Sequence, residues 1–244
     1  MIKVSDLKIQ LGGKTVIDGI DFEVERGKTL AVMGKNGSGK STLLKAVAGL
    51  VASNAGSITV NGRDVSESLQ KTELPNLAYV FQKGGLFDSM DVFDNTAFGL
   101  VRMGVEEKLI QERVLASLQR VGLKGSERKF PSELSGGMQK RVGIARAVCM
   151  EPGIIIYDDP TAGLDPVLSD SIADLILEIR DSTGAASILA THDLYVVQKT
   201  ADMVILLYNG KAVFNGNNET FFSKQNDFAR QFIDGDIEGP IDIF

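Results

Sequence analysis

The residues best suited to chemistry in this sequence lie in a glycine-rich stretch that begins at Gly34. Its letters, GKNGSGKST, fit the pattern G-x-x-x-x-G-K-[ST]. In such a loop the backbone amides curl around phosphate oxygens, and the helix that follows points its positive end at them. The pattern predicts that Lys40 reaches the β- and γ-phosphates of a nucleotide and that the Ser41 hydroxyl binds Mg²⁺. The candidate phosphate-binding residues are Gly34, Lys35, Asn36, Gly37, Ser38, Gly39, Lys40, Ser41 and Thr42.

A second candidate is a carboxylate at the end of an apolar run. The letters IIIYD predict a buried strand that ends at Asp158. In a fold with a phosphate-binding loop, an Asp in this place holds Mg²⁺ from the second side. Many strands end in Asp, so the assignment of Asp158 depends on the phosphate-binding loop upstream. Asp158 is therefore a candidate metal residue together with Ser41.

The most specific string of the chain is LSGGMQKR, which begins at Leu134. Ser135 is suited to cap a helix that starts near Gly137, and two glycine amides at a helix start can bind an anion. The string resembles the signature of ATP-binding-cassette (ABC) ATPases, usually L-S-G-G-Q, with Met138 where Gln is commonest. The resemblance implies that Ser135, Gly136 and Gly137 of one subunit close over the γ-phosphate held by the other. ATP is then bound between two head-to-tail copies.

Further residues extend the resemblance in chain order. Gln82 follows an apolar run at residues 77–81 and resembles the Q-loop glutamine, which senses Mg²⁺ and the attacking water. Asp165 resembles the D-loop aspartate, which touches the opposite subunit. His192 is the only histidine and matches the switch histidine that contacts the γ-phosphate. The resemblance thus implies that Asp159, His192 and Gln82 are catalytic and that Ser41, Gln82 and Asp158 hold the metal.

Two positions depart from the family. Asp159 stands where a water-polarising Glu is usual, and its carboxylate is withdrawn by about 1.5 Å, one C–C bond. Pro160 follows and predicts an extended backbone at residue 159. A misplacement of about 1 Å can cost on the order of 10²-fold in rate, so slow hydrolysis is expected. Leu11 lies near the place where an aromatic side chain usually stacks on adenine, which predicts loose base selectivity.

The elements that must position these residues can be read along the chain. Short strands are predicted at residues 2–10, 20–24 and 57–60, and a buried strand at 29–33, followed by a helix from Lys40 to about Leu50. After residue 153, strands and helices alternate, which predicts a parallel sheet with helices on its faces. In between, the helical pattern of residues 106–121 predicts that one face of a helix carries Leu109, Val114, Leu115, Leu118 and Val121.

These segments predict one α/β fold. The resemblance implies a P-loop NTPase of the ABC type, with an N-terminal antiparallel β subdomain and an inserted helical subdomain at about residues 91–150. Residues 1–226 are expected to form a single nucleotide-binding domain, and residues 227–244 a C-terminal extension. In that extension Phe228, Phe232 and Ile233 suit one face of a short helix. Residues after Gly235 are expected to gain order only on another surface: the same subunit, a second copy, which we favour, or an accessory protein.

Composition limits the class of protein further. Of 244 residues, 43% are hydrophobic and 24% charged, as in soluble globular proteins. The net charge of −6 argues against a nonspecific nucleic-acid binder. No apolar run approaches the roughly 18 residues that span a bilayer, and the N-terminus lacks a signal-peptide pattern. A single cysteine, Cys149, excludes an intrachain disulfide and fits a reducing cytosol. The resemblance to ABC ATPases implies in addition that the protein is cytoplasmic and held at the inner face of the cytoplasmic membrane by a permease.

Two further strings point to one group within the family. KGGLFDSMDVFDN at residues 83–95 and FARQFIDGDIEGP at residues 228–240 are similar to ATPases of Mce/Mla-type phospholipid transport systems. In the family, the first region receives the coupling helix of the membrane subunit. The resemblance implies partners: a second copy, an integral-membrane permease, and Mce-domain and STAS-domain subunits. A soluble ABC ATPase of the assembly-factor type and a slowly hydrolysing ATP-driven clamp remain as alternatives.

Overall fold

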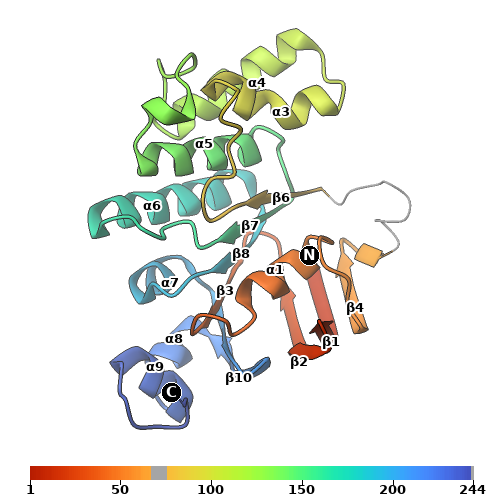
Figure 1. Cartoon of the computed structure of the whole chain (residues 1–244), viewed down its shortest axis with the longest axis vertical. Coiled ribbons are helices and arrows are strands. Elements are labelled where there is room, and N and C mark those ends of the chain that lie inside the picture. Colours follow the sequence, from red (N-terminus) through yellow and green to blue (C-terminus); the bar gives the residue numbers. More distant parts are fainter. Residues whose placement is uncertain (67–75, 243–244) are drawn as a thin grey trace.

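The computed structural model describes residues 1–66 and 76–242, and its centre is a six-stranded mixed sheet (Figure 1). The strand order is β10-β9-β3-β8-β7-β6, and all neighbours are parallel except β10 and β9. The strands are β3 (Thr29–Gly34), β6 (Leu77–Val80), β7 (Ile154–Asp158), β8 (Ala186–Ala190), β9 (Met203–Tyr208) and β10 (Lys211–Asn217). Every residue of β3, β7 and β8 is buried, as continuous apolar runs require in a sheet covered on both faces.

A second, antiparallel sheet lies beside the first and has the order β2-β1-β4-β5. Its strands are β1 (Ile2–Leu11), β2 (Lys14–Val24), β4 (Ala55–Val60) and β5 (Arg63–Asp64). The helix α1 (Lys40–Val47) lies between the two sheets in Figure 1 and shares one apolar core with both. That core includes Ile17 of β2, Leu43 of α1 and Ile156 of β7. It holds the glycine-rich loop between β3 and α1 in a fixed place.

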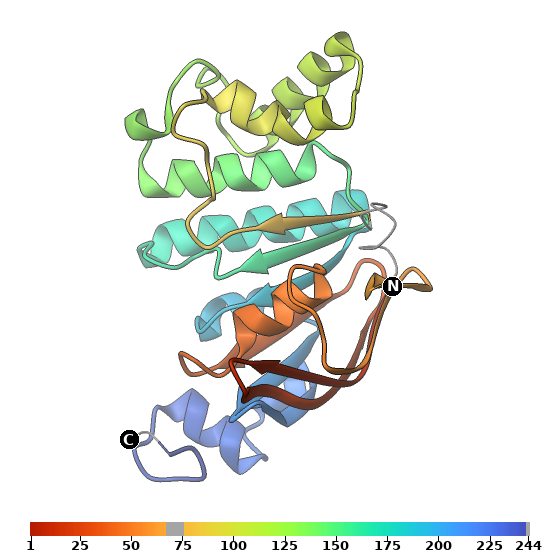
Figure 2. The same cartoon turned by 45° about the vertical axis from the view of Figure 1, so that its right-hand side comes forward.

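The helical lobe contains α3 (Val92–Arg102), α4 (Glu107–Arg120), a short 3₁₀ helix (Pro131–Glu133) and α5 (Gly136–Val148). Figures 1 and 2 show α3 and α4 stacked beyond α5, on the side away from the sheets. The fold class expected from the sequence is therefore confirmed. The prediction of the apolar face of α4 was partly wrong, because Leu109 and Leu115 are exposed and Ile110 is buried instead. Residues 110, 114, 118 and 121 keep the helical spacing, whereas 109 and 115 lie on its flanks.

The remaining helices follow the expected alternation. The helix α6 (Pro166–Thr183) packs with α5 over the sheet, and α7 (Leu194–Thr200) joins β8 to β9. Two short helices follow the last strand: α8 (Asn218–Phe222), which no sequence pattern indicated, and α9 (Asp227–Asp234). Within the described part of the chain, none of the helices combines the length and the apolar character needed to span a bilayer.

The C-terminal segment folds back on its own protomer. The buried side chain of Gln231 donates to the carbonyl of Ile241 at 3.0 Å and accepts from its amide at 2.6 Å. Farther along, the amide of Asp242 donates to the Tyr208 hydroxyl at 2.9 Å, and Lys35 donates to the Asp242 carbonyl at 2.8 Å. The described part of this segment therefore packs on its own protomer, one of the three surfaces considered, and packing on a second copy stays a prediction. One buried amide side chain supplies the backbone partners that this segment lacks by itself.

Candidate functional site

The glycine-rich loop takes a shape that its glycines alone permit. Gly34 has a φ of 143°, and a Cβ there would lie 2.4 Å from the Leu207 carbonyl oxygen of β9. Gly39, at the start of α1, has a φ of 102°, and its Cβ would meet Ile17 at 2.9 Å. The strand therefore turns into the helix without side chains in the way. The amides at the start of α1 remain directed into the loop.

Lys40 extends back over this loop. Its Nζ donates to the carbonyl oxygens of Gly34 at 2.7 Å and Lys35 at 3.0 Å. Burial lowers the pKa of Lys40, while the charges of Asp159 and Asp158 act in the opposite direction. Phosphate oxygens would compete with these two carbonyls for the same ammonium. The structure thus places a half-buried cation at the centre of the predicted phosphate site.

The candidate metal residues Ser41 and Asp158 lie in contact. The Ser41 hydroxyl donates to Asp158 Oδ1 at 2.8 Å, and the Tyr79 hydroxyl donates to Asp158 Oδ2 at 2.9 Å. Burial raises the pKa of Tyr79, and Asp158 raises it further, so the phenol stays a donor. Sequence reasoning missed Tyr79. The signal that could have found it is its place in the strand next to β7, where it pairs with Ile156.

The donor set at Asp158 suits Mg²⁺. A hydroxyl and a carboxylate are hard oxygen ligands, and Mg²⁺ takes one or two carboxylates together with phosphates and water. Among residues 1–66 and 76–242, no group of three or more His, Cys, Asp or Glu side chains could hold a metal ion by itself. A metal at Ser41 and Asp158 would therefore depend on further ligands, such as Gln82, nucleotide phosphates and water.

Asp159 brings the three candidate catalytic side chains together. Its Oδ2 lies 3.3 Å from Gln82 Nε2 and 3.3 Å from His192 Nδ1. Its Oδ1 accepts from the hydroxyl of Thr191 at 3.3 Å, a neighbour that sequence reasoning missed. The Asp159 carboxylate is largely buried, whereas the His192 side chain is mostly exposed. A carboxylate in contact with these three side chains can orient a water and accept its proton.

The backbone at Asp159 differs from the expectation. Its φ is +49°, in the left-handed region, whereas Pro160 had predicted an extended conformation. The reason is a tight turn at the end of β7. There the Asp159 amide donates to the Ala190 carbonyl at 2.8 Å, and the Asp159 carbonyl accepts from Ala162 at 3.2 Å. Asp tolerates this conformation better than most residues do.

Candidates from the phosphate, metal and hydrolysis groups line one cavity of about 240 Å³, although Gly34, Lys35, Ser38 and His192 are not among its lining residues. It lies at the edge where β3, β7 and β8 end, with Asp158 opposite Ala190. Its lining residues are Val16, Asn36, Gly37, Gly39, Lys40, Ser41, Thr42, Gln82, Asp158, Asp159 and Ala190. Leu11 is exposed at the end of β1 and does not line it.

The candidates that the resemblance assigns to contact with a second copy also lie outside that cavity. Ser135 begins α5, where its Oγ accepts from the Met138 amide at 3.3 Å, and Gly136 beside it is exposed. Asp165 is exposed too, and it caps α6 by accepting from Val167 at 3.0 Å and Leu168 at 2.9 Å. Within one protomer, the structure does not bring these residues to the phosphate loop.

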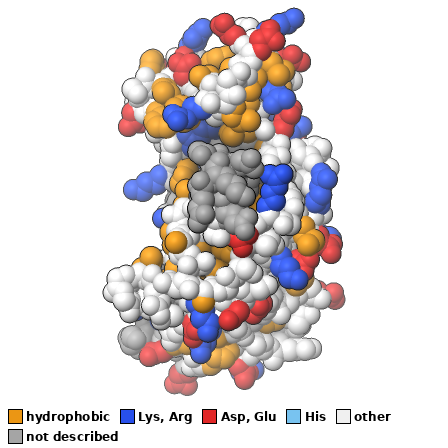
Figure 3. Space-filling model, turned by 90° about the vertical axis from the view of Figure 1, so that its right-hand side faces the viewer, with side chains coloured by type: hydrophobic (Ala, Val, Ile, Leu, Met, Phe, Trp, Pro, Cys, Tyr) orange, Lys and Arg blue, Asp and Glu red, His pale blue; other side chains and the backbone are white. Residues whose placement is uncertain are grey.

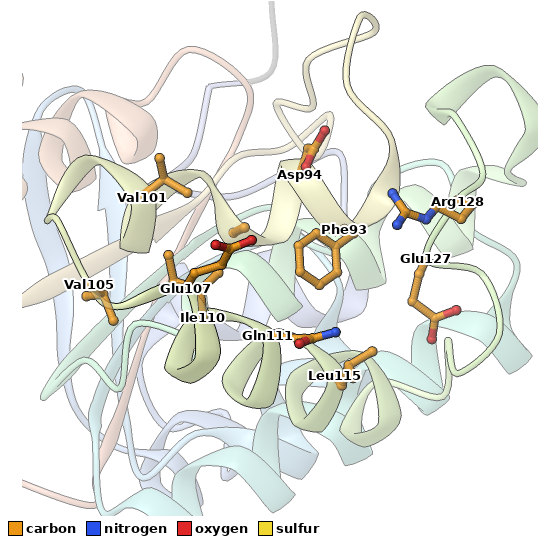
Figure 4. Close-up of a pocket in the computed structure, with 11 residues that line it drawn as sticks. Phe93, Asp94, Val101, Val105, Glu107, Ile110, Gln111, Leu115, Glu127 and Arg128 are labelled. Carbon is orange, nitrogen blue, oxygen red and sulfur yellow. The ribbon is translucent and has the colours of Figure 1, made fainter.

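A larger cavity of about 570 Å³ lies in the helical lobe between α3 and α4. Figure 4 shows Phe93 of α3 facing Ile110 and Gln111 of α4, with Glu127 and Arg128 beside them. None of the candidate phosphate, metal or hydrolysis residues lines it. The candidate residues thus line the smaller cavity and not the larger one.

A phosphate loop at the carboxyl end of a parallel sheet, a carboxylate on the neighbouring strand and an inserted helical lobe define a nucleotide-binding domain of the P-loop class. The particular family follows from comparison. This chain belongs to the ABC transporter family, whose sequence pattern matches residues 17–162.

Curated relatives extend the match over nearly the whole chain. One is the protein TRIGALACTOSYLDIACYLGLYCEROL 3, chloroplastic, of Arabidopsis thaliana, which is 37% identical over 99% of this chain and 75% of its own length. Another is the intermembrane phospholipid transport system ATP-binding protein MlaF of Escherichia coli K12, 34% identical over 99% of this chain and 91% of its own length. A third, from Mycobacterium leprae, is named a probable ribonucleotide transport ATP-binding protein and is 36% identical over 98% and 70%.

Solved structures share the fold. The structure of cbiO1 from Clostridium perfringens, described as part of the ABC transporter complex cbiONQ, has a TM-score of 0.82 at 32% identity. It covers 92% of this chain and 91% of its own. A dimeric ATP-binding cassette in a post-hydrolysis state with ADP and Pi has a TM-score of 0.80 at 25% identity, over 89% and 99% of the two chains.

Proposed function

We propose that this chain is the ATP-binding and ATP-hydrolysing subunit of an ABC transporter that moves phospholipid between membranes. One observation carries the ATPase part: Gln82 and Asp159 line one cavity with Lys40, and the Asp159 carboxylate also lies 3.3 Å from His192 Nδ1. The cavity also holds the contact between Ser41 and Asp158. Phosphoryl transfer needs this combination of phosphate positioning, charge stabilisation and an oriented water.

Each residue then has a defined part in hydrolysis. The loop amides and Lys40 hold the phosphates, and Ser41, Asp158 and Gln82 would hold Mg²⁺, which supplies charge neutralisation at the phosphate oxygens. Asp159 orients the attacking water and accepts its proton, while His192 contacts the γ-phosphate. Tyr79 and Thr191 hold the two carboxylates in place. The short side chain of Asp159 makes slow turnover part of the proposal.

The binding site is proposed to be completed by a second copy. Ser135, Gly136 and Asp165 are exposed and lie away from the cavity of their own protomer. A head-to-tail homodimer would bring the α5 amides of one copy to the γ-phosphate bound by the other, where a helix N-terminus stabilises an anion. Similarity to a dimeric cassette supports this arrangement.

His192→Ala is expected to form a stable dimer in the presence of Mg-ATP. The exposed histidine is not needed to fold the site, so its loss should slow turnover and leave both ATP-binding surfaces intact. Light scattering of the full chain with and without Mg-ATP measures this directly. A monomer at about 100 μM protein with ATP bound would count against the composite site, since that concentration detects dimers of roughly −5 kcal/mol or tighter.

A membrane partner is proposed at the junction of the sheet and the helical lobe. A hollow of about 310 Å³ lies there, and Phe81 and Phe87 at its edge are 41% and 40% exposed. Figure 3 shows hydrophobic side chains gathered over the helical lobe, at the top of that view. Apolar side chains in such a hollow suit the coupling helix of a permease. The chain would then be peripheral on the cytoplasmic side of the membrane.

The phospholipid cargo rests on resemblance. The strings at residues 83–95 and 228–240 and the likeness to MlaF over nearly the full chain favour it. They also favour Mce-domain and STAS-domain partners. We propose residues 1–226, with the helical lobe at about 91–150, as one nucleotide-binding domain and residues 227–244 as its C-terminal extension.

Affinity purification of the full chain from detergent-solubilised membranes tests the transporter reading. We expect an integral-membrane permease to copurify, and its presence in lipid vesicles to stimulate ATP turnover. A matched Phe87→Glu variant should lose the permease while it keeps ATP binding, because a charge in the hollow opposes an apolar partner. A chain that hydrolyses ATP with no membrane partner would favour the soluble alternative, and one that binds ATP with almost no turnover would favour the clamp.

A further inference from the structure

The helix α5 is held tightly against the loop that carries Gln82. Arg146 donates to the carbonyl oxygens of Gly84 and Gly85, both at 2.8 Å. One turn earlier, a Cβ at Gly143 would lie 3.1 Å from the Gly84 carbonyl oxygen, so the loop backbone lies directly on the helix. The loop after β6 and α5 therefore behave as one packed unit.

Lys140 lies on α5 at the end of this contact nearer Gln82, and its side chain also reaches Asp159. Only 8% of the residue is exposed. Its Nζ lies 3.0 Å from the Gln82 carbonyl oxygen and 3.4 Å from the Asp159 carbonyl oxygen. The side chains of these same two residues meet at 3.3 Å. One ammonium thus spans the main chains of the two residues whose side chains face the proposed water.

Burial of the Lys140 ammonium without a carboxylate partner in the described part of the chain costs free energy, which indicates that this residue has a function at this place. Among the residues described, no carboxylate lies within ion-pair distance of Lys140, and its partners are neutral carbonyls. An ammonium buried in this way loses hydration that a methionine of similar length would not need. Burial accordingly lowers the pKa of Lys140, although Asp159 raises it.

The backbone that Lys140 holds is a strained one. Asp159 has a φ of +49°, and such conformations persist where the surroundings fix them. The Asp159 carbonyl has two partners, the Ala162 amide and Lys140. A small shift of that peptide unit would swing the Asp159 carboxylate away from Gln82 and His192.

We propose that Lys140 is a positioning residue for ATP hydrolysis, which sets the spacing of Gln82 and Asp159 through their main-chain carbonyls. The proposal rests on the hydrolytic function proposed above and deepens it. Lys140 is on the helix that begins with Ser135, the residue offered to the second copy. In the proposed dimer, α5 of one copy contacts the nucleotide bound by the other. Lys140 therefore links the position of this helix to the geometry of the water site in its own protomer.

Three variants of the full chain test the proposal. Lys140→Met removes the ammonium and keeps the apolar stem, and Lys140→Arg keeps a cation with donors. The matched control is Arg141→Met, the next residue on α5, whose guanidinium donates to the Val121 carbonyl at 2.6 Å and to Ser171 at 2.5 Å, away from the water site. For each variant, the Kd of Mg-ATP, kcat and Tm are measured.

Lys140→Met is expected to lower kcat about thirtyfold while the Kd of Mg-ATP changes less than about threefold, since a displacement of about 1 Å costs on the order of 10² in rate. Lys140→Arg should recover kcat to within about fivefold of the natural chain. Arg141→Met should lower Tm, because it removes two hydrogen bonds, and should keep kcat within about threefold. If Lys140→Met does not fold, Lys140→Gln replaces it with the same expected split.

The proposal is overturned if Lys140→Met keeps its kcat, or if kcat falls equally in the Arg141→Met control. It is also overturned if Lys140→Arg gives no recovery. Failure of the hydrolytic function itself is recognised separately, because the natural chain would then bind Mg-ATP without turnover whatever residue stands at 140.

Discussion

Replacing Asp159 with Asn is expected to lower kcat by at least about a hundredfold and to leave the Kd of Mg-ATP within about threefold. The amide keeps the size of the side chain but cannot accept a proton from water, and loss of a general base typically costs 10²- to 10⁴-fold. Asp159 faces Gln82, Thr191 and His192, so its loss removes the centre of the cluster. Single-turnover measurement with Mg-ATP separates this chemical step from binding.

The control at this position is Thr191→Val, which removes one donor to Asp159 and keeps the carboxylate. We expect its kcat to fall about tenfold, because a hydrogen bond to a charged group contributes about 1.5–3 kcal/mol and 1.4 kcal/mol corresponds to tenfold. An Asn variant that hydrolysed ATP at the natural rate would show that Asp159 is not the base, and that Gln82 and His192 orient the water without it.

A second substitution at residue 159 tests the effect of the short Asp side chain on turnover. Asp159→Glu is expected to raise kcat by roughly tenfold, because the added methylene advances the carboxylate by about 1.5 Å toward the phosphates. The left-handed backbone acts against the longer residue, since Asp is the more frequent of the two in that conformation. A slower Glu variant would mean that Gln82, Thr191 and His192 are spaced for Asp.

Lys40→Ala is expected to weaken Mg-ATP binding about a hundredfold. Hydrogen bonds between charged groups contribute about 1.5–3 kcal/mol each, and 1.4 kcal/mol corresponds to tenfold in affinity. Lys40 is the loop cation whose Nζ already lies over the loop carbonyls at 2.7 and 3.0 Å. Calorimetric titration of the purified chain with Mg-ATP measures the change.

Lys45→Ala is the matched control for Lys40→Ala. It removes the same charge from the same helix, but Lys45 lies in the last turn of α1 and is exposed. The affinity of the Lys45→Ala variant for Mg-ATP should stay within about twofold of that of the natural chain, because an exposed charge interacts weakly with a distant ligand. Equal affinity of the Lys40→Ala variant and the natural chain for Mg-ATP would show that the nucleotide binds elsewhere.

Much of this protein could be predicted from the sequence because the signals are local. The loop from Gly34 to Thr42 needs glycines at given spacings, and those are visible as letters. Continuous apolar runs such as IIIYD predict strands buried on both faces, and β7 ends at Asp158 as expected. Parallel strands end at one edge of a sheet, so the meeting of Ser41 with Asp158 follows from topology. Resemblance to a family then supplied the order of the remaining elements.

Only the tertiary structure decided which side chains surround these residues and how their backbone lies. Tyr79 and Lys140 reach the site from other elements, and no periodicity predicts a partner far along the chain. The left-handed turn at Asp159 arises because its amide must pair with Ala190 of β8, which overrides the preference set by Pro160. Gln231 orders the C-terminal segment through the distant backbone of Ile241. In each case the deciding interaction is a hydrogen bond whose partner is brought near by packing, so its energy is absent from any local stretch of sequence.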